Sequence, residues 1–465
     1  MTSLIEELEK ICIKLKPKTE PIRAIKEHSD ICEFEEDKRK IIENLIGHSP
    51  LAEDSSPFRI EPCNNGKLCL KAHYYVGCWW LKRGEIFVEV LPKRDLNIPA
   101  ILEEIFEDKE IREKIENAFK FSMDEPLIEV ESSISNFLFF AILSFIHMVE
   151  KLVQRGIKKG YVEVEENLRN RIKGKVLVSR TVVKNSLKGY DNRVFCRYSL
   201  FIPDCLENRI IKFTLLFIKK YFLYNFGFSK NIGRRISYLL SAFETVKEVK
   251  ISDRDFLRVK NSIFYRDYDK AIKLAKAILR HKGFYRNIGS KEKTYITPFC
   301  IDMPRLFELW VWKKLKDELG KDYKIHYQYQ VSVESVNKEQ KPDFVIENSS
   351  KSSIIIADAK YKFNKIEFSD ISQISTYGRL ERLRKGTQEP LLILIYPLEK
   401  ENDTKSDSNG CEQELPFKNK KSKLFKCVKL KDFANFCICY VKLPLSSSNS
   451  FKKPVENGEG YRDTM

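Results

Sequence analysis

Two apolar segments joined by a polar turn constrain the fold of this chain more than any other feature. The stretch PDFVIENSSKSSIIIADAK carries Asp343 at its start and Asp358-Ala359-Lys360 at its end. Its central SSKSS supplies turn residues, so the two segments are predicted to form an antiparallel strand pair. Side chains alternate along a strand, which puts Asp358 and Lys360 on one face, and the pairing returns Asp343 to their side. We therefore expect two carboxylates and one ammonium group to meet at the edge of an apolar sheet.

This group of side chains contains what phosphodiester hydrolysis requires. Asp343 and Asp358, with a backbone carbonyl such as that of Ala359, supply the oxygen ligands that Mg²⁺ prefers. A bound ion lowers the pKa of water and neutralises the charge that builds up on the phosphate. Lys360 could orient the attacking water or stabilise the anionic transition state, and the sequence leaves both roles open.

The alternative interpretation is a surface ion pair, because Asp-x-Lys is common on strands. The preceding residues, IIIA at positions 354–357, argue against it, since they are typical of a buried strand. Charges next to a buried strand are costly unless they have a function.

Two predicted helices flank the candidate site. The pattern over residues 304–319 is helical and carries Glu308, which is a further candidate metal ligand. A second helical pattern, over residues 370–385, carries Gln373 and Tyr377 one turn apart, so that both can face the site. Gln373 is the better candidate, because packing of the helix explains Tyr377 equally well.

The order of the predicted elements indicates an α+β chain with several domains. The predicted regions are a helical extension over residues 1–60, a small β-rich domain with helices over residues 61–130, a mainly helical middle region with a basic hairpin over residues 131–290, and a C-terminal α/β domain with a mixed central sheet over residues 291–445. Residues 399–423 are interpreted as a flexible insertion and residues 446–465 as a disordered tail.

The middle region combines helical and extended patterns. Residues 134–155 predict a long helix that ends at Gly156. Its most apolar part, residues 137–149, is too short to cross a bilayer and is typical of a buried helix. Residues 161–183 predict a strand, a turn and a second strand. Further helices are predicted over residues 208–224, 236–249 and 267–281.

The chain carries an excess of basic residues. Its 465 residues include 83 Lys and Arg against 66 Asp and Glu, a formal net charge of +17 at pH 7. Such an excess favours a polyanionic partner, and an ordinary basic surface is the alternative. Arg169, Arg171, Lys173 and Lys175 could contact DNA phosphates or a partner protein, or they could form a solvated basic strand.

The twelve cysteines indicate neither a zinc site nor a disulfide framework. No CxxC pair occurs, and Cys437 and Cys439 alternate with apolar residues as on a strand. We therefore expect nearly all of the cysteines to be reduced, small hydrophobic residues. The amino terminus contains acidic residues and lacks the apolar core of a signal peptide, so a cytoplasmic protein without a membrane partner is expected.

The pattern P-D…D-x-K at Asp343, Asp358 and Lys360 resembles the motif of the PD-(D/E)xK nuclease superfamily. In that superfamily an upstream helix also supplies a glutamate, which Glu308 matches here. The resemblance implies a restriction-endonuclease-like fold for the C-terminal domain, with Gln373 as an additional catalytic residue.

More narrowly, the chain resembles the McrC family, the nuclease subunits of McrBC 5-methylcytosine restriction systems. The resemblance covers about residues 70–445. The similar segments are YVGCWWLKRGEIFVEVLPK (75–93), ENLRNRIKG (166–174), ENRIIKFTLLF (207–217), IDMPRLFELWV (301–311), IIIADAKYK (354–362), DISQISTYG (370–378) and LLILIYP (391–397).

This resemblance implies a Mg²⁺-dependent endonuclease that cuts double-stranded, modified DNA together with a hexameric McrB-like AAA+ GTPase. It also implies that the amino-terminal region, including residues 61–130, binds this motor and that the chain stimulates NTP hydrolysis. The chain contains no GxxxxGK[ST] motif, so no nucleotide is expected to bind through a P-loop of its own.

Two departures from the family pattern stand out. Asn170 replaces a glycine of the family segment, although asparagine tolerates left-handed backbone geometry. Residues 1–60 and 399–423 have no counterpart in the family pattern.

Two other functions stay open at this point. The chain could be a non-catalytic activator of an AAA+ motor, in which the acidic residues are structural. It could also be a basic DNA-binding module, which leaves the acidic cluster unexplained.

Overall fold

The computed structural model forms two compact units, one from residues 1–130 and 296–450 and one from residues 131–295 and 451–465. It describes residues 22–26, 30–34, 58–62, 68–72, 74–82, 86–93, 96–121, 125–126, 128–130, 135–221, 230–259, 266–280, 294–319, 323–333, 338–348, 354–363, 366–383, 389–398, 424–429 and 435–445. The predicted insertion at 399–423 and the predicted tail at 446–465 lie outside these residues.

The first unit contains a mixed sheet of six described strands in the order β14-β17-β18-β19-β21-β20. The strands are β14 (Tyr323–Tyr327), β17 (Phe344–Asn348), β18 (Ile354–Ala359), β19 (Leu391–Pro397), β20 (Phe425–Lys429) and β21 (Phe436–Val441). β17 and β18 pair antiparallel, whereas β19 pairs parallel with both β18 and β21. The prediction of a mixed central sheet is therefore confirmed. A separate antiparallel pair, β15 (Val331–Val333) and β16 (Lys338–Gln340), lies between β14 and β17 in the sequence.

Helix α13 (Phe368–Gly378) packs on this sheet because one of its sides is apolar. Its Ile374 and Tyr377 share a buried cluster with Val345 of β17 and Ile356 of β18. Since side chains alternate along a strand, residues two positions from Val345 and Ile356 face the same helix. The 3₁₀ turn η7 (Glu381–Leu383) follows α13.

Helix α12 (Met303–Leu319) was predicted over almost the same residues, and it is buried on several sides. The Trp312 ring stacks on Tyr327 of β14, with 4.2 Å between ring centroids. On another side, the Trp310 indole donates a 2.6 Å hydrogen bond to Glu104. These contacts hold α12 between the six-stranded sheet and the amino-terminal part of the same unit.

The amino-terminal part contains a second sheet, in the order β1-β6-β5-β13-β7. Its strands are β1 (Ile22–Lys26), β5 (Tyr75–Lys82), β6 (Ile86–Leu91), β7 (Phe119–Phe121) and β13 (Phe299–Asp302). A three-stranded sheet combines β2 (Asp30–Phe34), β3 (Phe58–Pro62) and β4 (Leu68–Ala72). The helical prediction for residues 1–60 is wrong at β1, β2 and β3, because short charged segments lack a clear period and here pair with strands beyond residue 60.

The helices of this part follow the second sheet. α3 (Ile98–Glu107) buries an apolar stripe that includes Ile101 and Phe106. It is followed by the short helix α4 (Lys109–Arg112) and the 3₁₀ turn η3 (Ile115–Ala118). Strand β13 leads directly into α12, so the amino-terminal sheet and the helix that carries Glu308 form one continuous structure.

The second unit is built on helices that pack around α5 (Ser135–Arg155). The predicted buried helix is confirmed, since its side chains from Leu138 to Phe140 and at Ile146 are almost completely buried. The other helices are α7 (Leu206–Tyr221), α8 (Lys230–Ala242), α9 (Asp253–Arg258) and α10 (Arg266–Arg280). None of the helices in the described part of the chain is long and apolar enough to span a membrane. The strands β8 (Ile128–Val130) and β12 (Thr294–Ile296) lie where the chain passes between the two units.

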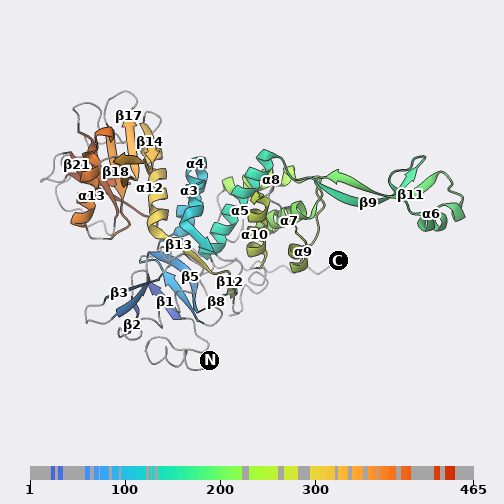
Figure 1. Ribbon diagram of the computed structural model, residues 1–465, viewed down its shortest axis with the longest axis horizontal. Coiled ribbons are helices and arrows are strands. Elements are labelled where there is room, and N and C mark those ends of the chain that lie inside the picture. Colours follow the sequence, from blue (N-terminus) through green and yellow to red (C-terminus); the bar gives the residue numbers. More distant parts are fainter. Residues whose placement is uncertain are drawn as a thin grey trace. The chain divides into compact units, whose positions relative to one another are not determined.

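A long strand pair, called the arm here (residues 160–202), extends from these helices, with α6 (Val178–Lys184) at its far end (Figure 1). β9 (Gly160–Arg169) pairs antiparallel with β11 (Arg193–Ile202) over its full length. The two-residue strand β10 (Lys175–Val176) also pairs with β11. The predicted second strand within residues 161–183 is therefore wrong beyond Val176, because the chain forms a helix and the turn η4 (Ser186–Lys188) before it returns.

An asparagine stands at each end of the arm, one with buried hydrogen bonds and one with a left-handed backbone conformation. At its base, the buried Asn208 of α7 donates hydrogen bonds to the carbonyls of Lys158 and Pro203 and accepts one from Tyr268 of α10. At its far end, Asn170 has the left-handed φ of 55° that was expected to be tolerated there.

The cysteine prediction needs a correction in the edge strands of the six-stranded sheet. Cys427 and Cys439 are register partners on β20 and β21 and form a disulfide, with 4.0 Å between their Cα atoms. Cys437 is also disulfide-bonded. The prediction failed because the alternation that identified a strand did not reveal which residue would lie across from it. Cys196, Cys205 and Cys300 are free and buried, as predicted, and Cys78 is also buried.

Candidate functional site

The paired strands β17 and β18 bring the predicted acidic residues together. Phe344 lies opposite Ala357 in the antiparallel register, so the next position sets Asp343 opposite Asp358. Both face the side of the sheet that α13 covers, because they lie two residues from Val345 and Ile356. The carboxylate of Asp343 accepts a 2.9 Å hydrogen bond from the backbone N–H of Ala359. This bond holds the start of β17 against the end of β18.

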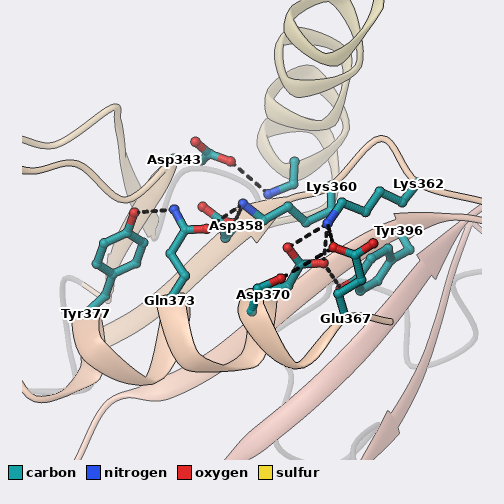
Figure 2. Close-up of polar contacts among 11 residues, drawn as sticks. Asp343, Asp358, Lys360, Lys362, Glu367, Asp370, Gln373, Tyr377 and Tyr396 are labelled. Atoms are coloured by element: carbon teal, nitrogen blue, oxygen red, sulfur yellow. Dashed lines mark hydrogen bonds and ion pairs between the residues drawn. The ribbon is translucent and has the colours of Figure 1, made fainter. Parts of the chain in front are cut away.

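Lys360 joins Asp358 to α13. Its ammonium nitrogen lies 2.6 Å from Oδ2 of Asp358 and donates a 2.9 Å hydrogen bond to Oε1 of Gln373. Gln373 in turn donates a 2.7 Å bond to the hydroxyl of Tyr377. Figure 2 shows the Lys360 amine between Asp358 and the Gln373 amide. The structure therefore gathers the predicted residues Asp343, Asp358, Lys360 and Gln373 at one end of the sheet, and it gives Tyr377 both a polar contact and a packing role.

Glu308 approaches the same place from α12. Its side chain is 12% exposed, and its carboxylate accepts a 2.8 Å hydrogen bond from the amide of Gln328. Arg305, one turn earlier on α12, lies 3.5 Å from the other carboxylate oxygen.

Burial and the neighbouring acidic groups together influence the pKa values of Asp343 and Glu308. Burial raises the pKa of Asp343 well above its ordinary value, and the negative charges of Asp358 and Glu308 raise it further. Burial also raises the pKa of Glu308. The Lys360 ammonium has the opposite balance: burial lowers its pKa, but its contacts with the neighbouring carboxylates outweigh this and leave it raised. A positive charge added beside the acids would therefore be strongly favoured.

The donor set consists of hard oxygen atoms. Within the described residues, no three His, Cys, Asp or Glu side chains converge closely enough to enclose an ion by themselves. An ion held by Asp343 and Asp358 would complete its shell with Glu308, backbone carbonyls, water or phosphate oxygens, as is common for Mg²⁺.

A second polar group lies next to the site and was not singled out from the sequence. Lys362 donates hydrogen bonds to Glu367 and to Asp370 at the start of α13, at 2.8 and 2.9 Å. The hydroxyl of the buried Tyr396 on β19 donates a 3.0 Å bond to the same Asp370. Figure 2 places this group beside the Lys360–Gln373 contact. The KYK sequence after Asp358 was the signal available for Lys362, whereas nothing local marked Asp370 or Tyr396.

The predicted basic residues lie elsewhere, on the arm of the second unit. Arg169, Arg171, Lys173 and Lys175 are all exposed at its far end. The Lys173 ammonium lies 4.3 Å from the centre of the Tyr198 ring. Arg169 and Lys175 form no ion pair with any residue that the structure describes.

The arm also exposes an apolar surface. Its helix α6 has no buried residue. The large apolar side chains exposed at the far end are Ile172, Val178, Val182, Val183, Leu187 and Tyr190. The charges of this segment could be predicted from the sequence, but its apolar surface could not. A strand, as predicted here, would have pointed half of these apolar side chains toward the interior of the protein.

The fold and the site define a mixed α+β protein with a cluster of buried and partly buried carboxylates and one lysine at the edge of its central sheet. A family model described as McrBC 5-methylcytosine restriction system component matches residues 70–397, and the chain belongs to this family. The resemblance to the McrC family that was found in the sequence is therefore confirmed.

Solved structures from Thermococcus gammatolerans are similar to this chain at a low level of sequence identity. A half-complex of McrB AAA+ hexamers with bound McrC shares 18% identity, covers 90% of this chain and 94% of that chain, and has a TM-score of 0.39. The McrBC complex from the same organism also shares 18% identity, covers 64% of this chain and 88% of that chain, and has a TM-score of 0.30. A search of curated proteins found no match.

Proposed function

We propose that this chain is the Mg²⁺-dependent DNA endonuclease subunit of a McrBC-like restriction system and that its C-terminal sheet carries a PD-(D/E)xK site. The observation that supports this most is the meeting of Asp343, Asp358 and Lys360 at the end of β17 and β18. Membership of the McrBC component family agrees with it.

The carboxylate cluster fits a divalent cation. Asp358 is buried and Asp343 is partly buried beside it, and burial together with the charge of Asp358 raises the pKa of Asp343. In this proposal Asp343 and Asp358 would hold Mg²⁺, and Glu308 and the backbone carbonyl of Ala359 would help to complete its shell. When bound, the ion supplies a lowered pKa for water and charge neutralisation at the phosphate.

The other residues act on the reacting groups directly or through Lys360. The Lys360 ammonium is placed to orient the attacking water or to stabilise the negative charge of the transition state. Gln373 fixes the position of Lys360 through its 2.9 Å hydrogen bond. The partly exposed end of the sheet leaves room for a DNA phosphate, since the side chain of Lys360 is 19% exposed.

The partner in this proposal is a hexameric AAA+ GTPase like McrB, and the DNA substrate is double-stranded and modified. The exposed apolar surface of α6 with the exposed charges of Arg169 and Lys175 suits a protein partner with apolar and acidic contacts. The basic residues could instead contact DNA. The non-catalytic activator is the competing function, and separate measurement of hydrolysis and cleavage distinguishes the two.

The test is the variant Asp358→Ala, assayed with the purified motor, NTP, Mg²⁺ and methylated DNA. We expect cleavage to be lost while complex assembly and stimulation of NTP hydrolysis are retained. The control Asp317→Ala removes an acidic residue of α12 that pairs with Lys313 on the surface, and cleavage should be unchanged. Cleavage by Asp358→Ala at the normal rate would refute the proposal, and stimulation without cleavage by the unmodified chain under all metal conditions would favour the activator.

A further inference from the structure

Gln328, the first residue after β14, has a backbone conformation that residues with side chains rarely adopt. Its φ is 50°, in the left-handed region. Among the described residues, the other non-glycine positions with positive φ are Asn170 and Asn435, and asparagine is the type that tolerates this conformation best. A glutamine held in this conformation is strained, and strain of this kind is often found where a function requires it.

The contacts of Gln328 connect two acidic residues of the candidate site. Its backbone N–H donates a 2.7 Å hydrogen bond to the carbonyl of Asp343. Its side-chain Nε2 donates a 2.8 Å bond to Oε1 of Glu308. The amide oxygen accepts a 3.4 Å bond from the guanidinium of Arg305. Because a guanidinium can only donate, the amide oxygen must face Arg305, and Nε2 is left to face Glu308.

The left-handed turn is what allows both contacts at once. The backbone of Gln328 continues the pairing of β14 with β17, whereas its side chain turns toward α12. Without the amide, the Glu308 carboxylate would keep its 3.5 Å contact with Arg305 and would still be repelled by Asp358. Burial raises the pKa of Glu308, and the charge of Asp358 adds to this rise. The contact with Arg305 and the repulsion by Asp358 would both draw the Glu308 carboxylate away from the two aspartates.

We propose that Gln328 is a positioning residue, which keeps the Glu308 carboxylate near Asp343 and Asp358, so that its negative charge adds to theirs when the two aspartates bind a divalent cation. This inference rests on the proposed function. It assigns Gln328 no contact with the substrate.

The test is the variant Gln328→Gly, which removes the amide and relieves the strained backbone. We expect the affinity for Mn²⁺ or Mg²⁺, measured by calorimetric titration of the full chain, to fall by about 10- to 100-fold, as for other residues that orient metal ligands. The unfolding temperature of the metal-free protein should be unchanged or higher, because glycine adopts this φ without strain. A residue that only maintained the fold would instead lower that temperature and leave the affinity of the folded protein unchanged.

Two further variants complete the test. Gln328→Asn keeps a residue suited to the left-handed conformation but shortens the side chain by one methylene, so metal affinity should also fall even if the glycine variant does not fold. Asn435→Gly relieves a similar φ of 53° before β21 and should leave metal affinity unchanged.

The same titration of Asp358→Ala separates this inference from the proposed function. If Asp358→Ala loses metal binding but both Gln328 variants retain it, the positioning role is refuted and the nuclease site stands. If Asp358→Ala binds metal like the unmodified chain, the proposed metal site itself is refuted, and the positioning role with it.

Discussion

At the scale of single residues, the far end of the arm depends on glycines with nearly the same backbone geometry but different surroundings. Gly174 has a φ of 71° and Gly189 a φ of 75°. A Cβ atom on Gly174 would lie 2.5 Å from the carbonyl oxygen of Arg197, whereas one on Gly189 would meet nothing within 4 Å. The first glycine is thus required by close packing of β10 on β11 and the second only by its conformation.

We predict that Gly174→Ala destabilises the second unit more than Gly189→Ala. The Gly189 variant has to bear only the left-handed conformation, at about 1 kcal/mol. The Gly174 variant adds a clash with backbone atoms, for a total of about 3 kcal/mol. Thermal unfolding followed by circular dichroism, with limited proteolysis of the arm, measures the difference. Equal effects of the two substitutions would show that the packing of β10 on β11 is looser than described.

At the scale of elements, the group around Lys362 ties the end of β18 to the start of α13. Lys362 follows Lys360 by two residues, and its partner Asp370 precedes Gln373 by three. Burial lowers the pKa of Lys362, but its hydrogen bonds with Glu367 and Asp370 outweigh this and leave it raised. The contact therefore keeps Lys362 charged and sets the distance between the strand and the helix that meet at the Lys360–Gln373 hydrogen bond.

We predict that Lys362→Met and Asp370→Asn are coupled in a double-mutant cycle by about 1 to 3 kcal/mol, since the Asp370 side chain is only 6% exposed. Each variant should also reduce cleavage with the motor partner by about tenfold, because Gln373 loses its fixed position. The control pair Lys313→Met and Asp317→Asn is an i,i+4 pair of α12 in which the Asp317 side chain is 50% exposed, and it should couple by less than about 0.5 kcal/mol. Independent effects of Lys362 and Asp370 would mean that they do not act as one unit.

Elements were predicted well where the pattern that forms them is local. α12 and the strands β17 and β18 each contain their own apolar period, so their positions followed from the sequence. The helix predicted over residues 370–385 was right at its start but wrong beyond Gly378, where α13 ends and the turn η7 follows. The partner of β9 was missed, because β11 begins more than 20 residues after β9 ends and the segment 175–183 offered a nearer alternative. Pairing between distant segments depends on packing that a local pattern does not contain.

In the candidate site, too, residues that lie close together in the sequence could be predicted and residues that depend on distant segments could not. Asp343, Asp358 and Lys360 could be predicted because they belong to one pair of neighbouring strands. Gln328 could not, because its role depends on Glu308 in an earlier helix and on Asp343 in a later strand. Which side chain fills the space between such elements is decided by tertiary packing.

At the scale of the whole molecule, the candidate site and the arm belong to different compact units. The acidic cluster lies in the unit of residues 1–130 and 296–450, and the apolar and basic arm lies in the other. A change in one unit should therefore leave the local structure of the other unchanged, so that cleavage and partner stimulation can be lost separately.

We predict that the double variant Val182→Ser, Leu187→Ser leaves stability nearly unchanged, because these side chains are 42% and 75% exposed. Stimulation of the partner's NTP hydrolysis should fall by at least about tenfold, since an apolar contact with the partner is lost. Metal binding by the chain should stay normal. The control Tyr238→Ser removes an exposed aromatic side chain of α8 outside the arm, and stimulation should be unaffected. Normal stimulation by the double variant would exclude this surface as the partner contact.

The place of β13 in the amino-terminal sheet has a consequence for synthesis on the ribosome. β13 lies between β5 and β7, yet it is made roughly 220 residues after β5, when residues 131–295 of the second unit have already been synthesised. At about 5 to 20 residues per second, translation needs roughly 10 to 40 s to cover that interval. During this time one edge of β5 lacks its strand, and its backbone hydrogen-bonding groups are open to pairing with other nascent chains. The first unit thus reaches its final form only after residues 131–295 of the second unit have been made, although its amino-terminal half is synthesised first.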